Sequence, residues 1–326
     1  MTHSVTLIPG DWIGPEVAKV AKVVIAAAGV SIDWDEQPVD EAGITESVLE
    51  SCRHTGVVLK GRINAPRIEG HLPPTVQLRK ALGLWSTVRP VTALPNIGAR
   101  FKDIDVIVVR ETSEDIYAGF EHEVTDGVYE AVKITTRTAC ERIARAAFEL
   151  AVTRGRKKVT IVHKSNIMKK SDGMFLRVAQ DVALEFPQIE AEEAIVDALC
   201  MRLVKWPMQF DVLLTANLFG DIVSDLCSGL AGGITASPSA SYGEGIAMFE
   251  NPHGRAEALV GTGQANPIPM LRTAVLMLQH LGEADAAARI DNAIKSVCVD
   301  GLETTDQGGN AGCAAVQAAI LAKLEK

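Results

Sequence analysis

Residues 217–225 read Asn217-Leu218-Phe219-Gly220-Asp221-Ile222-Val223-Ser224-Asp225, directly after a strand-like run at 210–215. Asp221 and Asp225 are four residues apart, so on a helix they stand one turn apart on the same face. Two like charges so placed repel, and a divalent cation between them removes the penalty, because hard cations such as Mg²⁺ take carboxylate oxygens. The stretch predicts a strand followed by a metal-binding helix. The alternative is an ordinary acidic helix N-terminus, which the helix dipole tolerates.

Length and composition set the broad class. A chain of 326 residues favours two lobes, because single cores stop growing at about 250–300 residues. Hydrophobic residues make up 47% and charged residues 22%, as in an ordinary soluble globular protein. The formal charge of −9 argues against a nucleic-acid-binding surface, which would need a basic stripe. An anionic substrate remains compatible with it, since Lys and Arg can be concentrated in a cleft.

The cysteines and the apolar segments predict the compartment. The six cysteines are dispersed, without a CxxC or Cys/His metal spacing, which favours buried free thiols in a reducing compartment. The N-terminus runs straight into the strand-like residues 5–8, with no signal peptide. The longest apolar stretch, 23–30, is too short to span a bilayer. We expect a cytoplasmic protein with no membrane or nucleic-acid partner.

Strand and helix patterns alternate along the chain, which predicts an α/β fold. No internal repeat, low-complexity tract or long linker interrupts them. Strands are expected at 5–9, 104–109, 159–162 and 212–214, and helices at 15–27, 137–154 and, with breaks near 282 and 301–312, from 266 to the end.

The familiar nucleotide and hydrolase motifs are missing from the sequence. There is no Walker-type phosphate loop, GxSxG or HExxH. Gly243-x-Gly245 and Gly261-x-Gly263 both lack the third glycine of a dinucleotide fingerprint. A dinucleotide would therefore bind here without a standard Rossmann loop.

Three arginines are candidates for binding carboxylates. Arg79, Arg89 and Arg110 are placed in extended or loop contexts, and Arg110 ends the apolar run 104–109. The planar guanidinium pairs bidentately with carboxylates. The alternative for each is a solvated surface salt bridge. Arg110 fits that alternative least well, because a buried strand leads into it.

A tyrosine, a lysine and a further aspartate complete the candidates. Tyr117 is one of three tyrosines, and such residues are usually packing residues with a wet hydroxyl. Lys164 follows the strand at 159–162, at the end where open α/β sheets place ligand sites. A lysine beside a metal has its ammonium form disfavoured, which suits it to proton transfer. Asp197 follows the apolar residues 194–196 as a third carboxylate at a strand end.

Taken in order, these residues resemble a known family, the β-decarboxylating dehydrogenases of isocitrate, homoisocitrate and 3-isopropylmalate. The similarity covers nearly the whole chain and is closest to the NAD-linked isocitrate enzymes in the central stretches. The matching motifs are Ile8-Pro9-Gly10-Asp11-Trp12-Ile13-Gly14-Pro15-Glu16, Leu78-Arg79 with Arg89-Pro90, Arg110-Glu111-Thr112 with Tyr117, His163-Lys164-Ser165-Asn166-Ile167, Asp197, Asn217-Leu218-Phe219-Gly220-Asp221 with Asp225, and Phe249-Glu250 with His253-Gly254 and Asn266-Pro267.

The resemblance implies a two-lobed α/β fold with a central sheet and flanking helices. It implies a large lobe of residues 1–95 and 233–326 on the cofactor side. It places the substrate and metal residues and the dimer contact in a small lobe of residues 96–232. The active site would lie in the cleft between them.

The resemblance also implies metal-dependent oxidative decarboxylation of a hydroxy di- or tricarboxylate, as in the tricarboxylic acid cycle. Lys164 would help remove the hydroxyl proton and Tyr117 would protonate the enol carbon. Since the positions of Lys164 and Asp197 come from the second subunit in the family, a homodimer with shared active sites is implied. The implied binding residues are Arg79, Arg89, Arg110, Thr75 and Asn166 for substrate, Asp197, Asp221 and Asp225 for Mg²⁺ or Mn²⁺, and Glu250, His253, Gly254 and Asn266 for NAD.

The chain departs from the family pattern in its recognition segments. Pro73 and Thr75 stand where isocitrate enzymes carry Ser and Asn, and isopropylmalate enzymes place leucines nearby. Ala258-Leu259 replaces both the Asp-Ile of NAD enzymes and the Lys-Tyr of NADP enzymes, and Arg255 lies close by. NAD is favoured because the cation pair is missing.

Two further departures lie elsewhere. Trp12 replaces the glycine of a Gly-Asp-Gly motif, and Asn64-Ala65-Pro66 replaces a Thr-Thr-Pro-like segment on the nicotinamide side.

Three hypotheses follow. The leading one is an NAD-dependent isocitrate dehydrogenase. The second keeps the reaction but takes 3-isopropylmalate or another 3-substituted malate. The third is a non-catalytic regulatory chain, although such a chain has no chemical need for Tyr117, Lys164, Asp197, Asp221 and Asp225.

Overall fold

The computed structural model of the protein divides into two compact units. The described residues are 2–39, 43–63, 72–251, 254 and 256–325. Unit 1 comprises residues 1–84, 93–102 and 231–326, and unit 2 comprises residues 85–92 and 103–230. The lobe boundaries implied by the family resemblance remain a prediction.

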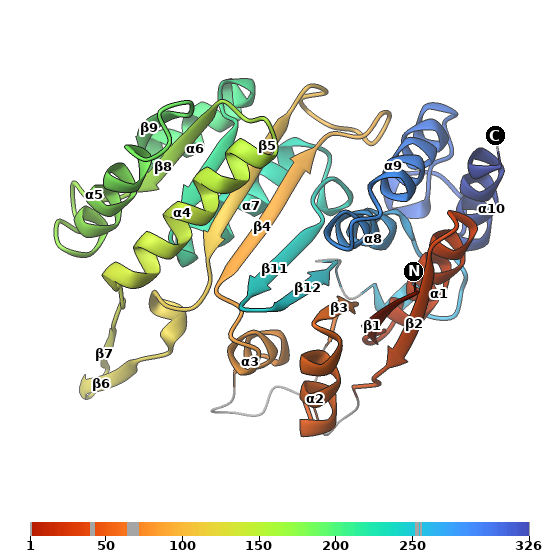
Figure 1. Cartoon of the computed structure of the whole chain (residues 1–326), viewed down its shortest axis with the longest axis horizontal. Coiled ribbons are helices and arrows are strands. Elements are labelled where there is room, and N and C mark those ends of the chain that lie inside the picture. The colour runs from red at the N-terminus through yellow and green to blue at the C-terminus, as the bar shows by residue number, and fades with distance from the viewer. Residues whose placement is uncertain (1, 40–42, 64–71, 252–253, 255, 326) are drawn as a thin grey trace. The chain divides into compact units, whose positions relative to one another are not determined.

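Unit 1 is an α/β unit on a mostly parallel sheet (Figure 1). Its strands are β1 (Thr2–Ile8), β2 (Ser31–Glu36), β3 (Val57–Lys60), β11 (Ser239–Gly243) and β12 (Ile246–Glu250). Its helices are α1 (Gly14–Ala27), α2 (Glu46–Thr55), α3 (Pro74–Ala81), α8 (Ile268–His280), α9 (Ala284–Val299), α10 (Cys313–Leu324) and the 3-10 turns Ile234–Ala236, Glu257–Leu259 and Thr305–Gln307. The strand order is β2-β1-β3-β12-β11, and only the β11–β12 pair is antiparallel.

The local signals in unit 1 agree with its elements. Pro15 stands in the first turn of α1, where its missing N–H costs nothing, and Gly29 follows the helix with φ +84°. The expected helix at 15–27 and the three C-terminal helices are confirmed. The core joins Ile8, Val58, Leu78 and Met248 from four different elements.

Unit 2 is a second α/β unit. Its strands are β4 (Ser86–Thr92), β5 (Asp105–Glu111), β8 (Lys158–His163), β9 (Glu190–Ile195), β10 (Val212–Thr215) and the hairpin β6 (Glu121–Thr125) and β7 (Val128–Ala131). Its helices are α4 (Arg137–Thr153), α5 (Ser171–Ala183), α6 (Val196–Lys205), α7 (Asn217–Leu230) and the 3-10 turns Ile116–Ala118 and Pro207–Gln209. The strand order is β4-β5-β10-β8-β9, and only β4 runs antiparallel to its neighbour.

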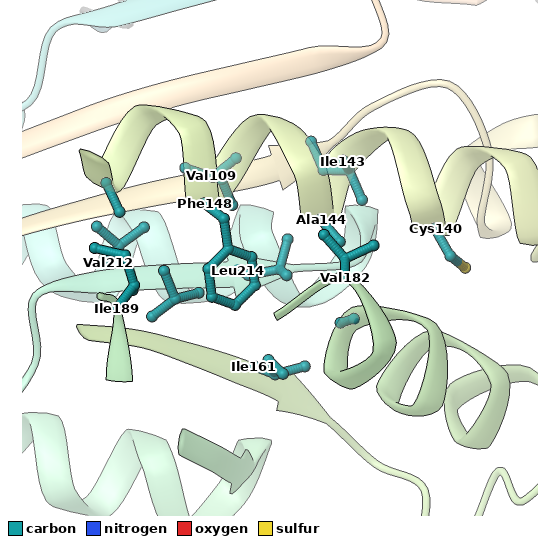
Figure 2. Packing of buried hydrophobic residues seen from close by; sticks show 14 of the residues in the cluster. Val109, Cys140, Ile143, Ala144, Phe148, Ile161, Val182, Ile189, Val212 and Leu214 are labelled. Carbon is teal, nitrogen blue, oxygen red and sulfur yellow. The ribbon is translucent and has the colours of Figure 1, made fainter. Parts of the chain in front are cut away.

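The core of unit 2 explains why its central strands read as continuous apolar runs. Strands covered on both faces need apolar side chains on both. The stripe of α4 packs against them, and Figure 2 shows Phe148 directed at Val212 and Leu214 of β10. The Thr136 hydroxyl caps α4 by accepting the Ala139 N–H at 3.2 Å. The α/β class and the strands expected at 104–109, 159–162 and 212–214 are confirmed.

The cysteines of the described chain are free thiols, and all but the half-buried Cys200 are buried. Of the helices that the structure describes, none has both the length and the apolar character required to cross a bilayer.

Candidate active site

The helix predicted over 217–225 is confirmed. Strand β10 ends at Thr215, and α7 begins at Asn217. Asp221 and Asp225 lie one turn apart on α7, with side chains 42% and 77% exposed. Their carboxylates are therefore open enough to accept a ligand from solution.

Gly220 allows α7 to approach β5 closely. A Cβ atom at this position would lie 2.5 Å from Cγ of Arg110 and would also overlap the Thr215 hydroxyl. Only glycine fits this approach without a shift of its neighbours. The close packing places the first turns of α7 beside the end of β5.

Arg110 is the buried centre of this site. It is 5% exposed and lies at the carboxyl end of β5. Its guanidinium donates to Oδ1 of Asn217 at 2.9 and 2.7 Å and forms an ion pair with Asp221. It also lies 5.2 Å from the ring centre of Tyr117. The alternative of a solvated surface arginine is wrong for Arg110.

Tyr117 and Asp221 form a donor–acceptor pair. The Tyr117 hydroxyl donates to Oδ2 of Asp221 at 2.6 Å. Partial burial and the adjacent Asp221 carboxylate raise the pKa of Tyr117. Although partial burial opposes it, the charge of Arg110 and the hydrogen bond from Tyr117 hold the pKa of Asp221 below its usual value. A protonated phenol therefore faces an ionised carboxylate.

Arg89 on β4 makes the equivalent contact one turn further along α7. It donates to the Ser224 hydroxyl at 2.9 Å and to Oδ1 of Asp225 at 2.6 Å. The prediction that Asp221 and Asp225 repel each other unless a cation is bound needs correction, because each carboxylate is paired with its own arginine. The case for a metal rests instead on their exposed oxygens.

Lys164 and Asp197 form a separate pair. Lys164 follows β8 as expected, and its ammonium pairs with Asp197 in the first turn of α6. The hydrogen bond from Lys164 lowers the pKa of Asp197. Asn166 lies exposed in the turn that follows.

The three predicted metal ligands do not meet within one chain. Among the residues that the structure describes, no three His, Cys, Asp or Glu side chains gather to hold a metal ion. The expectation that Asp197 is supplied by a second copy of the chain stays a prediction.

In unit 1, a buried charge cluster surrounds Glu250. Arg79 lies on helix α3, so its predicted extended or loop context is wrong. It pairs with Glu250, and so does Lys60, with Nζ 3.1 Å from Oε2. Although burial opposes it, these two cations hold the pKa of Glu250 far below its usual value. Lys60 also donates to the Thr75 hydroxyl at 3.3 Å.

The sequence interpretation missed Lys60. It is 1% exposed, and burial lowers its pKa even though Glu250 opposes the shift. The available signal was its place at the end of the apolar strand β3, the same signal that identified Arg110.

The other predicted cofactor residues lie in different surroundings, and their role stays a prediction. Asn266 is buried, accepts the N–H of Ile268, the first residue of α8, at 2.9 Å and donates to Asp306 at 3.1 Å. Gly254 and Ala258 are exposed. Trp12 has φ +53°, a conformation uncommon for residues other than glycine, which explains why the family pattern has glycine there. His253, Arg255 and the segment 64–66 lie outside the described residues.

Comparisons with known proteins give the chain a family. The model of the family described as isocitrate/isopropylmalate dehydrogenase matches residues 4–320. The chain is 42% identical over 314 residues to a mitochondrial regulatory subunit of isocitrate dehydrogenase (NAD) from Dictyostelium discoideum, covering 95% of this chain and 89% of that protein. It is 44% identical over 304 residues to the chloroplastic 3-isopropylmalate dehydrogenase of Solanum tuberosum, covering 91% and 85%.

A comparison with solved structures gives the same family. The crystal structure of isocitrate dehydrogenase from Methylococcus capsulatus matches with a TM-score of 0.93 and 40% identity, covering 99% of this chain and all of that one. The α/β architecture thus matches that of a solved isocitrate dehydrogenase. The chain belongs to the isocitrate/isopropylmalate dehydrogenase family, and the resemblance seen in its motifs is confirmed.

Proposed function

We propose that the protein catalyses the metal-dependent oxidative decarboxylation of a 3-carboxy-2-hydroxy acid with hydride transfer to NAD, and that it converts isocitrate to 2-oxoglutarate. One observation carries this proposal: the Tyr117 hydroxyl donates to Asp221 beside the buried Arg110. A proton donor, a carboxylate able to bind a cation and a guanidinium able to bind a carboxylate therefore lie together.

The carboxylates of α7 fit a divalent cation. Asp221 and Asp225 present ionised, solvent-accessible oxygens of the kind that Mg²⁺ or Mn²⁺ prefers, and Asp197 of the partner subunit would complete the set. Glu250, His253, Gly254 and Asn266 are the proposed NAD residues. When bound, the cation supplies Lewis-acid stabilisation of negative charge on the substrate oxygen, and NAD supplies the hydride acceptor.

The side chains would move the protons. Lys164 in its neutral amine form, which a nearby cation favours over the ammonium, would accept the proton of the C2 hydroxyl as the C2 hydride departs. After CO₂ is lost, Tyr117 would donate its hydroxyl proton to the carbon that carried the carboxylate. The raised pKa of Tyr117 suits this role, because it keeps the phenol protonated at neutral pH.

The arginines would bind and exchange carboxylates. Arg79, Arg89 and Arg110 are proposed to hold the substrate carboxylates, helped by Thr75 and Asn166. In the structure Arg110 holds Asp221, so a substrate carboxylate must compete with that aspartate. Arg110 becomes available when Asp221 turns towards a cation. Metal and substrate should therefore bind with positive coupling.

A homodimer with shared sites is part of the proposal. The β6–β7 hairpin is exposed along its length and projects from the rest of unit 2 (Figure 1). Phe120, directly before β6, and Tyr129 on β7 are 61% and 65% exposed. A two-stranded hairpin is marginally stable alone, and these apolar side chains would be covered by a second copy of the chain.

Steady-state assays test the substrate. The purified protein is measured with isocitrate, 3-isopropylmalate and other 3-substituted malates, each with Mn²⁺ and with NAD or NADP. We expect the highest kcat/KM for isocitrate with NAD. A higher kcat/KM for 3-isopropylmalate would select the alternative substrate, towards which Pro73 and Thr75 point.

A regulatory chain is the second candidate, favoured by the named Dictyostelium relative, which is a regulatory chain. It predicts no turnover on any malate together with binding of citrate-like ligands. The free thiols support the cytoplasm as the proposed compartment, although named relatives include mitochondrial and chloroplastic proteins.

A further inference from the structure

A buried ion-pair bridge joins the loop of Tyr117 to the loop of Lys164 within unit 2. Nζ of Lys133 lies 3.2 Å from Oδ1 of Asp115 and 3.3 Å from Oδ1 of Asp172. Both aspartates are 2% exposed, and the Lys133 side chain is 16% exposed. Two buried carboxylates therefore share one ammonium, which we call the Lys133 bridge.

At one end of the bridge, Asp115 ties Tyr117 to α7. Its Oδ1 accepts the Ile116 N–H at 2.8 Å, at the start of the 3-10 turn that carries Tyr117. Its Oδ2 accepts the Leu218 N–H at 2.9 Å, in the first turn of α7. One carboxylate thus fixes Tyr117 relative to the helix of Asp221.

Asp115 holds this position at a conformational cost. Its backbone has φ +78° and ψ −154°, a strained region that residues other than glycine rarely adopt. Such a conformation persists only when surrounding contacts over-determine it. The ion pair with Lys133 is one of those contacts.

At the other end, Asp172 holds the start of the Lys164 loop. Its Oδ2 accepts the Lys164 backbone N–H at 2.7 Å. The Lys133 ammonium also lies 5.3 Å from the ring centre of Phe219 on α7. Lys133 is therefore in contact with both loops and with the helix.

We propose that Lys133 is a positioning residue that sets the places of Tyr117 and Lys164 through Asp115 and Asp172. The inference rests on the proposed function, in which these two residues donate and accept the protons. The adjoining cavity is lined by Lys133, Asp115 and Asn217 among others and has a volume of about 10 Å³, which is room for a single water. Lys133 acts there through its neighbours and not on a substrate.

The central test is Lys133→Met, which keeps most of the side-chain volume and removes the ammonium. Without it two buried carboxylates lose their cation, and both loops loosen. We expect kcat on the best malate substrate to fall about 10- to 100-fold. We expect KM to stay within about threefold, because no substrate contact is removed. Lys133→Arg should restore most of kcat.

A matched control variant shows whether the loss of any ion pair in unit 2 would lower kcat as Lys133→Met is expected to do. Lys158 pairs with Glu192 at 3.2 Å and is 20% exposed in the same unit. Lys158→Met should leave kcat within about twofold of the unmodified enzyme, since Glu192 is only partly buried and keeps its ion pair with Arg202. An equal loss of kcat in both variants would overturn the proposal.

A double variant separates positioning from stability. The double variant Lys133→Met with Asp172→Asn removes one of the two buried carboxylates that have lost their cation. The Tm of the double variant should therefore recover towards that of the unmodified protein. Its kcat should stay low, because the bridge is still absent. Recovery of kcat together with Tm would show that Lys133 acts only on stability.

Amide hydrogen exchange gives a readout that needs no activity. In Lys133→Met, the N–H groups of Leu218, Ile116 and Lys164 should exchange faster, and in Lys158→Met they should not. Unchanged exchange rates of these N–H groups in Lys133→Met would overturn the proposal that Lys133 positions the two loops. If the unmodified protein turns over no malate but the exchange result holds, the proposed reaction fails while the bridge stands.

Discussion

At the scale of single residues, the candidate site consists of three side chains in mutual contact, which shift the pKa values of Asp221 and Tyr117. Arg110 is buried, pairs with Asp221 and lies against the ring of Tyr117. The guanidinium favours the ionised carboxylate, and the carboxylate favours the protonated phenol. The proposed chemistry depends on these two protonation states, because Tyr117 must donate a proton while Asp221 stays anionic.

Removing the Tyr117 hydroxyl tests its role as the acid. Tyr117→Phe should lower kcat by about 10²- to 10⁴-fold, the usual contribution of general acid catalysis, with a small change in KM. Tyr242→Phe is the control, because Tyr242 packs edge-on against Phe249 in unit 1 and its kcat should not change. A Tyr117→Phe enzyme with full kcat would remove Tyr117 from the mechanism.

The metal prediction belongs to the two carboxylates of α7. Asp221→Asn and Asp225→Asn keep the side-chain size but remove one charge each. Both should raise the Mn²⁺ concentration needed for half-maximal activity and reduce the Tm increase produced by Mn²⁺ with substrate. The effect should be larger at Asp221, which we assign as an inner-sphere ligand. The exposed Asp181→Asn on α5 should change neither quantity, and a normal metal response in Asp221→Asn would contradict the assignment.

The dependence of Tm on acidic pH tests the ion pair between Arg110 and Asp221. The pKa of Asp221 lies below its ordinary value of 3.8 when folded, so its ionised form stabilises the fold. That stability is fully present above the ordinary value and is lost as the pH falls through the folded value. The Tm difference between the unmodified protein and Asp221→Asn should therefore shrink on acidification below about pH 4. A Tm difference that stays constant down to about pH 3 would show that Arg110 does not lower this pKa.

At the scale of elements, the packing of α7 on β5 builds the site. The helix is held close by Gly220, which has no side chain to collide with Arg110 or Thr215. Asn217 fixes the guanidinium from the first turn of the helix. The geometry of the candidate site thus follows from the close approach of α7 to β5.

Two glycines of α7 give a matched test of this packing. Gly220→Ala should lower the free energy of unfolding by about 1–3 kcal/mol, the usual cost of overpacking, and should reduce kcat by displacing Arg110. A Cβ at Gly229 meets nothing within 4 Å, so Gly229→Ala should raise stability by up to about 1 kcal/mol through helix propensity. Denaturant unfolding measures both, and equal effects would refute the close-approach argument.

At the scale of the whole molecule, the chain is organised as two units, each with its own hydrophobic core. Within unit 2, Lys164 and Asp197 pair with each other and not with the carboxylates of α7. A complete metal and proton-transfer site therefore requires a second copy of the chain under the proposed function.

Subunit mixing tests that requirement. Tyr117→Phe and Lys164→Met are each expected to be inactive as homodimers. If sites are shared, a mixed dimer holds one site with both changes and one site with neither. Reassociated equal mixtures should then recover about a quarter of the unmodified activity, because half of the randomly formed dimers are mixed. No recovery in dimers shown to exchange their chains would place each site within one chain.

The sequence by itself determined the local structure and the family. Apolar runs and helical spacing predicted β5, β10, α4 and α7, because the periodicity of side-chain burial is a local property of the backbone. The place of Arg110 at a strand end also followed from its immediate neighbours. The specific motifs identified the family. The local context misplaced Arg79, because the short helix α3 buries only Leu78 and so gives little apolar periodicity.

Only the tertiary structure decided which charges meet. Arg110 and Asp221 are 111 residues apart in sequence, and Arg79 and Glu250 are 171 apart. The ion-pair partners of Lys60 and of Lys133 could not be predicted from the sequence either, because no local pattern specifies a long-range pair. Strand order and the close approach of α7 bring these residues together, and burial then makes each unpaired charge costly. The pairing of charges is therefore a property of the packed fold, which spacing along the chain cannot reveal.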